Sequence, residues 1–353
     1  MSWDALDFAV AAATVRRIAL VLLALLVCGN AFAEKAALFS EHEILDVTLS
    51  GPVFRTIKDT RERTERPFVL SADGRDHKVM VRVRGKSRVK LCHFPPLRLK
   101  FSSQDTAGSV FEGQRKVKLV SHCNSGARAT DAVLREYAAY RIFTLLSDAS
   151  YQVRLLRIQY EDTESGSKRR GVGSPQYAFL LEPTAALGAR VGGTRLTVPG
   201  VSLASLDDRQ EALVYVFQYL IGNIDWSLAR AEGDDRCCHN GDLIDLPHTR
   251  YVVPYDFDLS RFVHASYKSS RAAVRLRNVP YREYKGYCLP EATLRDALRA
   301  VTGKRNEILA VVEALPLLSA RQSARSLDYL TSFFEKARDE EKLLQDFSRK
   351  CQS

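Results

Sequence analysis

Apolar and polar residues alternate in short stretches through the first third of the chain. The stretches are "ILDVTLSG" (44–51), "RPFVLSADG" (66–74), "HKVMVRVRG" (77–85) and "LRLKF" (97–101). A period of two residues is typical of half-buried strands, and glycine at the end of a stretch is typical of a turn. We therefore predict an antiparallel β region over residues 36–101.

Between residues 114 and 182 the strand pattern is interrupted by one segment with helical spacing. "QRKVKLVSH" (114–122) continues the strand pattern, whereas apolar residues from Val133 to Leu146 have helical spacing, with Thr130 or Asp131 as the cap. "YQVRLLRIQYED" (151–162) and "QYAFLLE" (176–182) again indicate strands. The predicted order is β, α, β, β.

Helical spacing dominates after Gly200. Residues 207–223 predict an amphipathic helix capped at Asp207 or at the residue before it. "GDLIDL" and "RYVVPYDFD" indicate two short strands, and the chain from Leu294 onward is helical. We predict an α+β protein with a β-rich N-terminal lobe, residues 34–182, and a mainly helical C-terminal lobe, residues 183–353.

Residues 1–33 have the features of a signal peptide. A basic pair, Arg16-Arg17, precedes an apolar run from Ile18 to Val27 and a small-residue end at Ala31-Phe32-Ala33. Cleavage is expected before Glu34, so we predict an exported protein, periplasmic or secreted. No later stretch has the length of a transmembrane helix, and the mature chain is expected to have no such segment.

Two alternatives stay open at this end of the chain. Translation from near Val15 would remove the two aspartates that are unusual for a leader. Lipid attachment at Cys28 is a weaker alternative, because valine and not a small residue precedes that cysteine.

The formal net charge is +10, and cleavage would leave it unchanged because the leader holds two arginines and two aspartates. The basic residues are spread along the chain, which favours a solvated basic surface over a nucleic-acid site. We expect no nucleic-acid partner. An anionic ligand or membrane surface stays compatible with this charge.

Cysteine usage indicates an oxidising compartment. Six cysteines remain after cleavage, and an even number in an exported chain favours disulfides. Cys92 and Cys123 lie in segments that both look extended and can pair across a sheet, although six cysteines allow 15 connectivities. A metal site at Cys237-Cys238-His239 is disfavoured, because three consecutive residues do not easily turn onto one ion.

A strand lysine and a helix glutamate form the first candidate set. Lys118 lies in "KVKLVSH", and Glu136 lies on the predicted helix that follows. Such a pair can hold nucleotide phosphates, with the glutamate fixing the ammonium group. The alternative is a solvated edge lysine and an exposed glutamate.

Oxygen-bearing side chains flank the predicted hairpin and form the second set. Asp225 follows a helix, Asn240 precedes one strand, and Asp256 and Asp258 follow the other. An asparagine and an aspartate can share a hard cation such as Mg²⁺ and leave another aspartate free as a base. Each residue alone is also an ordinary turn former.

The chain resembles the spore coat protein H (CotH) family of secreted atypical kinases from about Val79 to Phe262. The segments that carry this resemblance are "VRVRGKSRVKLCHFPPLRLKF", "KVKLVSHC", "LREYAAYRIF", "YAFLLE", "YLIGNIDWS" and "YVVPYDFDLSRF". The "GN-x-D" loop is also similar to that of HipA-type kinases. The resemblance implies a protein-kinase-like two-lobed fold that uses ATP and Mg²⁺, or Mn²⁺ or Ca²⁺.

The resemblance assigns nucleotide contacts mainly to the N-terminal lobe. Lys118 would hold the phosphates and Glu136 would brace it. Glu182 would lie at the hinge where adenine stacks, and Gly85 and Ser87 would form the turn that covers the phosphates.

The resemblance assigns the reacting and metal-binding groups to the C-terminal lobe. Asp225 would be the catalytic aspartate, Asn240 and Asp256 would bind the metal, and Asp258 would assist. Fifteen positions separate Asp225 from Asn240, where kinase loops have about five, so an insertion with two cysteines lies within the site. Oxidation of those cysteines is one way to bring Asn240 into place.

Three functions fit these patterns. The first is an exported kinase-fold protein that transfers phosphate from a nucleotide to an exported or envelope protein. The second is a catalytically silent cation-binding or envelope-assembly protein on the same fold, favoured by the scarcity of ATP outside the cytoplasm. The third is a carboxylate-dependent envelope hydrolase that uses Asp225 and Asp256. It is disfavoured because nothing marks a sugar-binding cleft such as clustered tryptophans: the chain has only two tryptophans, and one lies in the leader.

Overall fold

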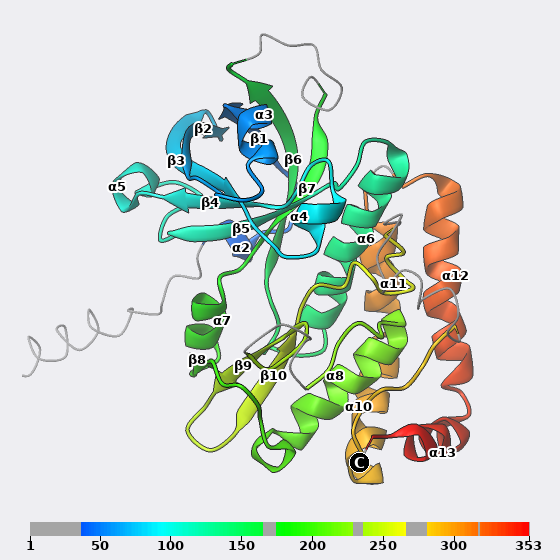
Figure 1. The fold of residues 1–353 in the computed structure, drawn as a ribbon. Coiled ribbons are helices and arrows are strands. Elements are labelled where there is room, and N and C mark those ends of the chain that lie inside the picture. The colour runs from blue at the N-terminus through cyan, green and yellow to red at the C-terminus, as the bar shows by residue number, and fades with distance from the viewer. Residues whose placement is uncertain (1–36, 165–173, 229–235, 266–280, 317, 353) are drawn as a thin grey trace, which may run out of the picture.

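The computed structural model describes residues 37–164, 174–228, 236–265, 281–316 and 318–352, so the predicted leader lies outside the described residues. A β-rich N-terminal part precedes a largely helical C-terminal part, as the sequence predicts, and Figure 1 shows the first above the second. The N-terminal strands form a closed barrel in the order β1-β2-β3-β4-β5-β7-β6. They are β1 (Leu45–Gly51), β2 (Arg66–Ala72), β3 (Arg75–Val83), β4 (Leu97–Phe101), β5 (Lys116–Ser121), β6 (Val153–Asp162) and β7 (Gln176–Leu181).

Barrel closure joins the first strand to a late one. β1 pairs with β2 in antiparallel fashion and with β6 in parallel fashion, and the other neighbours are antiparallel. Among the described residues, four short helices lie in the connections or before β1. They are α2 (Ala37–Ser40), α3 (Val53–Lys58), α4 (Arg88–Leu91) and α5 (Ser103–Thr106).

Strands β5, β6 and β7 are buried on both faces. Val117 and Leu119 of β5 point into the barrel core, whereas Val120 joins a second core with the helical part. On β7, Leu180 points into the barrel core, whereas Phe179 joins the second core. The near-continuous apolar runs of these strands follow from this two-sided burial.

Helix α6 (Ala127–Thr144) covers the outer face of these strands. It begins three residues before the predicted cap at Thr130, so the sequence prediction of its start is wrong. Gly126 precedes it with φ 105°, a backbone conformation that glycine adopts without a Cβ clash. A glycine start has no side-chain oxygen, and the capping pattern therefore points to the wrong residue.

The C-terminal part contains a small sheet and a set of longer helices. The strands β8 (Thr194–Leu196), β9 (Gly241–Asp245) and β10 (Arg250–Pro254) pair in the order β10-β9-β8. Between β8 and β9 lie the 3₁₀ turn η1 (Leu203–Ser205) and α8 (Asp208–Ile221), and α7 (Thr184–Arg190) precedes β8. The predicted cap of α8 is confirmed, because Asp207 accepts a hydrogen bond from the Gln210 amide at 2.9 Å.

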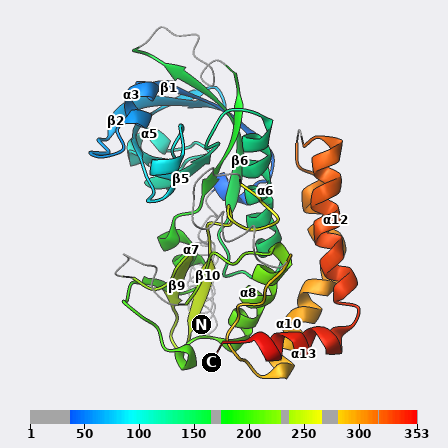
Figure 2. The ribbon, with the colours of Figure 1, turned by 45° about the vertical axis from the view of Figure 1, so that its right-hand side comes forward.

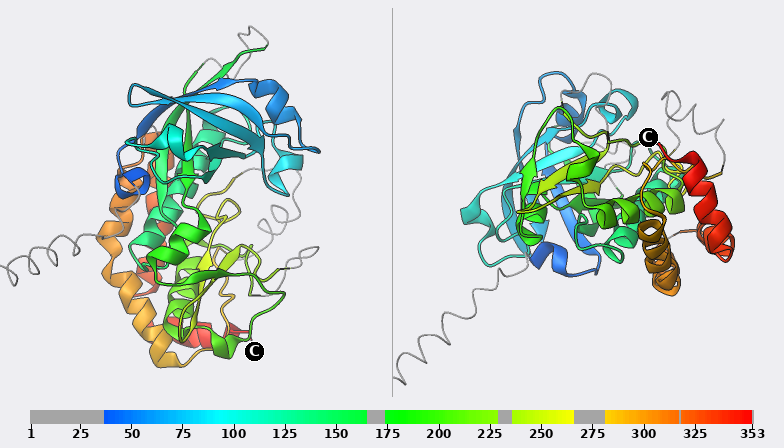
Figure 3. Two further views of the ribbon diagram at one scale, coloured as in Figure 1. Left: turned by 90° about the vertical axis from the view of Figure 1, so that its left-hand side faces the viewer. Right: turned by 90° about the horizontal axis from the view of Figure 1, so that it is seen from below.

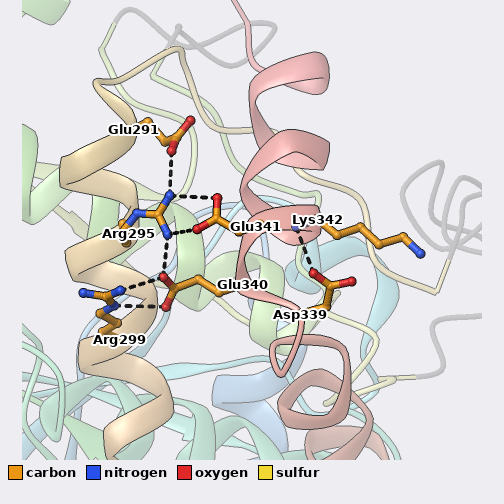
Figure 4. Close-up of polar contacts among 7 residues, drawn as sticks. All are labelled: Glu291, Arg295, Arg299, Asp339, Glu340, Glu341 and Lys342. Atoms are coloured by element: carbon orange, nitrogen blue, oxygen red, sulfur yellow. Dashed lines mark hydrogen bonds and ion pairs between the residues drawn. The ribbon is translucent and has the colours of Figure 1, made fainter.

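The last helices line one side of the molecule, away from β8–β10 (Figures 2 and 3). They are α10 (Glu291–Gly303), α11 (Arg305–Glu313), α12 (Ala320–Lys336) and α13 (Glu340–Lys350). Figure 4 shows how α10 and α13 are joined: Arg295 contacts Glu291 on its own helix and both Glu340 and Glu341 on α13. Arg299 adds two bonds to Glu340, at 2.9 and 3.0 Å.

The six cysteines of the described residues form three disulfides: Cys92–Cys123, Cys237–Cys238 and Cys288–Cys351. The predicted Cys92–Cys123 pair is confirmed, although Cys92 directly follows α4 and Cys123 lies beyond the end of β5, so neither is in a strand. These bonds agree with an oxidising compartment. Among the described helices, none combines the length and apolar character needed to cross a bilayer.

Candidate active site

A cavity of about 50 Å³ lies where the barrel meets the end of β10. It contains five of the predicted site residues: Gly85, Ser87, Lys118, Glu136 and Asp256. They come from the β3–β4 connection, β5, α6 and the segment after β10, so four separate elements converge here. The remaining lining residues are Arg84, Lys86, Arg88, Pro96, Val120, Tyr140, Leu181 and Tyr255.

Lys118 points out of the barrel into this cavity. Its Nζ lies 5.7 Å from the ring centre of Tyr151 and 5.4 Å from that of Tyr255. Burial lowers the pKa of Lys118 to about 8, Arg84 acts in the same direction, and Asp242 opposes both. Within the described residues, no hydrogen bond or ion pair joins this ammonium to a carboxylate.

The second cavity cation is Arg84, which follows β3. Burial lowers its pKa, while Asp256 across the cavity raises it. The described part of the chain offers it no ion pair either. Two cations without an acid partner therefore face one small space, which is the arrangement expected of an anion site.

Glu136 is not the partner of Lys118 that the sequence predicts. Its Oε2 accepts a hydrogen bond from Arg88 Nη2 at 2.8 Å, and the glutamate is 3% exposed. Burial raises the pKa of Glu136 and Arg88 opposes that rise. The helix glutamate is thus fixed by an arginine of α4.

Arg88 also contacts both aspartates of the "DFD" segment. Its Nη2 lies 3.2 Å from Asp256 Oδ1, and its Nε lies 2.8 Å from Asp258 Oδ2. The two carboxylates share one cation, the guanidinium of Arg88. Asp258 is buried, whereas the side chain of Asp256 is 40% exposed.

The backbone places Asp256 beyond the strand. β10 ends at Pro254, and Asp256 has φ 62°, which aspartate tolerates better than most residues. The Asp256 amide donates to the Tyr140 hydroxyl at 2.8 Å. Phe257 packs against Tyr140 and Phe217, with ring centres 4.6 and 5.3 Å away, so the segment is anchored on both sides of the aspartate.

Asp225 and Asn240 meet despite the insertion between them. Asn240 Nδ2 donates to the Asp225 backbone oxygen at 2.6 Å and to its Oδ2 at 3.1 Å. His239 Nε2 lies 3.0 Å from Asp225 Oδ1, and this hydrogen bond raises the pKa of His239. The adjacent Cys237–Cys238 disulfide lies next to this pair, and residues 229–235 of the insertion lie outside the described residues.

The hairpin brings this pair to the side of Asp256. Gly241 pairs with Pro254, so Asn240 and Tyr255 lie at the same end of β9 and β10. The Tyr255 amide donates to the Asn240 backbone oxygen at 3.0 Å. The negative charge of Asp256 adds to the raised pKa of His239, after the Asp225 hydrogen bond.

Glu182 lies at the junction after β7, outside the cavity lining. Its carboxylate accepts bonds from Arg190 at 2.8 and 3.0 Å and from the Gln152 amide at 3.0 Å. The side chain is therefore occupied by the protein itself.

The oxygen donors fit a hard divalent cation. In the described chain, Asp256 Oδ2 and the side-chain oxygen of Asn240 accept no hydrogen bond. No cluster of three or more His, Cys, Asp or Glu side chains around a metal position occurs among the described residues. Mg²⁺ commonly takes one or two protein ligands and completes its shell with substrate phosphates and water, so this sparse set suits it.

Sequence reasoning missed Arg84, Arg88, His239 and Asp242. Asp242 is buried and accepts hydrogen bonds from Tyr151, Thr184 and Arg195, and the charge of Lys118 acts to lower its pKa. The segment "RGKSR" has three basic residues around Gly85 and could have indicated this site. A basic turn that contains glycine can bind phosphate together with a lysine on a nearby strand. The contacts of Arg88 span 48 to 170 residues and have no local pattern.

The chain is similar in structure to solved proteins, one of them a bacterial kinase. No protein family and no curated protein matches the chain. The crystal structure of a Helicobacter pylori proinflammatory kinase, CtkA, matches with a TM-score of 0.37 and 11% identity, over 82% of this chain and 92% of that one.

Proposed function

We propose that this chain has a kinase-like two-lobed fold and transfers a phosphoryl group from a nucleotide such as ATP to a hydroxyl group. The observation that supports this best is the pair of cavity cations, Arg84 and Lys118, which lack a carboxylate partner in the described chain and face Asp256. Partly buried cations without an acid partner are costly, and a polyphosphate would compensate both.

The cavity volume limits what the present form can hold. About 50 Å³ suits a phosphate group, whereas ligand pockets for whole small molecules measure roughly 300–1,000 Å³. We infer that the phosphates enter this cavity and that the nucleoside binds where the lobes separate. Glu182 is assigned to that junction, where its backbone would border the base.

The protein groups then have distinct roles. Arg84 and Lys118 bind the phosphates under the turn of Gly85 and Ser87. Asp225, oriented by His239 and Asn240, accepts the proton of the attacking hydroxyl, whose oxygen bonds to the terminal phosphorus as the bond to the leaving diphosphate breaks.

Two oxygen donors are assigned to the metal. Asp256 and Asn240 would hold Mg²⁺, which supplies charge neutralisation for the phosphates when bound. Asp258 acts indirectly, because its contact is with Arg88.

The acceptor that we propose is an exported or envelope protein. The three disulfides support an oxidising location for the chain. Incubation with labelled ATP and envelope proteins tests transfer directly, and absence of label with every nucleotide and divalent metal would exclude the reaction.

Thermal unfolding with MgATP tests the binding part of the proposal. At 100 times Kd, a ligand raises the free energy of unfolding by about 2.7 kcal/mol. We expect this gain in the wild type, its loss in Lys118→Met and Asp256→Asn, and its retention in Lys116→Met. Lys116 is exposed on the same strand and is the matched control. Equal stabilisation of all four proteins would contradict the proposed site.

One observation favours the catalytically silent alternative. Arg88 faces three carboxylates, so the cluster has excess negative charge that a divalent cation can neutralise without a nucleotide. Stabilisation by Ca²⁺ alone, with no response to ATP, would support that function.

A further inference from the structure

The feature that carries a further inference is the ionic cluster around Arg88. One guanidinium contacts Glu136 and Asp256 through Nη2 and Asp258 through Nε, at 2.8, 3.2 and 2.8 Å. Arg88 is 8% exposed, Glu136 3% and Asp258 4%. The planar fork of arginine presents several donors in fixed directions, which a single ammonium group cannot reproduce.

The cluster joins three elements that are far apart in sequence. Arg88 begins α4, directly after the turn of Arg84 and Gly85 that lines the cavity. Glu136 comes from α6, and Asp256 and Asp258 come from the segment after β10. The turn that covers the phosphate cavity is therefore bonded to the helix and to the segment that contains the metal-binding aspartate.

This bonding separates Lys118 from Glu136. No ion pair links the two residues in the described chain, and Lys118 lies instead between the rings of Tyr151 and Tyr255. Asp242 is already bonded to Tyr151 and Arg195. The lysine is held by aromatic faces and keeps its ammonium available to an anion.

We infer that Arg88 is a positioning residue that orients Asp256 and fixes Glu136, and that Lys118 binds phosphate independently of Glu136. The inference deepens the proposed function and rests on it for the roles of phosphate and metal. The pairing itself stands on the structure alone and has its own test.

Unfolding by urea tests the pairing through double-mutant cycles on the full chain with intact disulfides. Arg88→Met and Glu136→Gln remove the same interaction. The double variant is therefore expected to unfold at about the same urea midpoint as the less stable of the two single variants. Lys118→Met and Glu136→Gln are expected to be additive. Additive effects for Arg88 and Glu136, or non-additive effects for Lys118 and Glu136, would overturn the pairing.

Binding of the ATP analogue AMP-PNP tests the positioning role. Arg88→Lys keeps the charge and removes the fork, so it isolates geometry from electrostatics. We expect its Kd in EDTA to stay within about twofold of wild type and the gain in affinity with Mg²⁺ to fall about tenfold, the usual effect of losing a residue that orients a metal ligand. Lys118→Met should weaken binding in EDTA, and Glu136→Gln should not.

Lys90→Met, on the exposed side of α4, is the control for a changed charge at this helix. An unchanged Mg²⁺ gain in Arg88→Lys, even with a lower unfolding midpoint, would reduce Arg88 to a structural residue and overturn the positioning role. No AMP-PNP binding by the wild type in any condition would overturn the proposed function and the positioning role with it, while the urea cycles still decide the pairing.

Discussion

The side chain of Lys118 is partly buried, yet its ammonium group can still contact an anion in the cavity. Burial and the second cation Arg84 disfavour its charge, and its pKa falls to about 8. The ammonium is therefore charged at neutral pH and loses its proton in a range where most lysines keep theirs.

Anion binding should follow this titration. We expect the affinity for AMP-PNP in EDTA to be constant below pH 7 and to fall by up to about tenfold per pH unit above the pKa, because only the charged form binds phosphate. Calorimetry between pH 6.5 and 9.5 measures it. Lys118→Met should bind more weakly with little pH dependence, and a flat profile in the wild type would refute the assignment.

Glu211 on α8 presents the opposite case, an acid that burial keeps protonated up to about pH 7. Burial raises its pKa to about 7, while a hydrogen bond from the Tyr215 hydroxyl opposes the rise. The unfolded chain ionises near 4.5, so the folded state binds more protons between these values. The stability due to this group is complete below pH 4.5 and is lost as pH rises toward 7.

Glu211→Gln should remove that loss, because an amide stays neutral and its oxygen can still accept from Tyr215. We expect the variant to match wild type at pH 4.5 and to unfold at a higher temperature than wild type at pH 7.5. Glu335→Gln, exposed on α12, is the control and should follow wild type at both values. A lower midpoint for Glu211→Gln at pH 7.5 would show that the charged form is the stable one.

At the scale of elements, local patterns predict most strands and several helices. The alternation of β1–β4 and the Asp207 cap of α8 are confirmed, because the signal and the structure are both local. The predicted cap of α6, Thr130 or Asp131, lies four or five residues after the observed one, since a left-handed glycine, Gly126, and not a polar residue precedes the helix.

In the candidate site, too, local patterns predict some features, whereas others depend on long-range packing. Hairpin register explains why Asn240 and Asp256 can be expected at one end of β9 and β10. The choice of Arg88 over Lys118 as the partner of Glu136 depends on which long side chain reaches the glutamate after packing. No spacing rule contains that information.

The α10–α13 contact gives a prediction at this scale. Cys288 and Cys351 connect the segment before α10 to the end of α13, 63 positions apart. We expect Cys288→Ser/Cys351→Ser to lower the free energy of unfolding by about 2–4 kcal/mol, mainly through a less restricted unfolded chain. Urea unfolding measures this, and the double substitution avoids a free thiol.

The ion pairs of Arg295 with α13 should hold the helix in place in that variant, so the AMP-PNP affinity is expected to be unchanged. A loss of binding would mean that α13 supports the site from a distance.

At the scale of the molecule, a shared apolar core and several polar contacts join the barrel to the helical part within the described residues. α6 packs on β7, Arg88 reaches the segment after β10, and Glu182 pairs with Arg190 where β7 leads into α7. Arg190 also donates to the backbone oxygens of Asp148 and Ser150, so one guanidinium holds three segments at the junction.

Arg190→Met should therefore be costly. It leaves the Glu182 carboxylate buried without its cation, and such a loss commonly destabilises by about 3–5 kcal/mol. Arg190→Met/Glu182→Gln should recover part of the loss. Arg157→Met, which breaks an exposed pair with Asp46, is the control and should change the unfolding midpoint little. Equal midpoints for the two single variants would contradict a special role for the junction.

The parallel pairing of β1 with β6 also determines the order in which the barrel can close. One edge of β1 can pair with β2 soon after synthesis, but its other edge must wait for the segment from Leu156 to Asp162. Contacts this distant in sequence slow folding, and an unpaired strand edge is a template for association with other chains. While the chain is synthesised from its N-terminus, one edge of β1 therefore stays unpaired until β6 has been made. We expect changes in β6 to lower the yield of folded protein more than they lower the stability of the folded state.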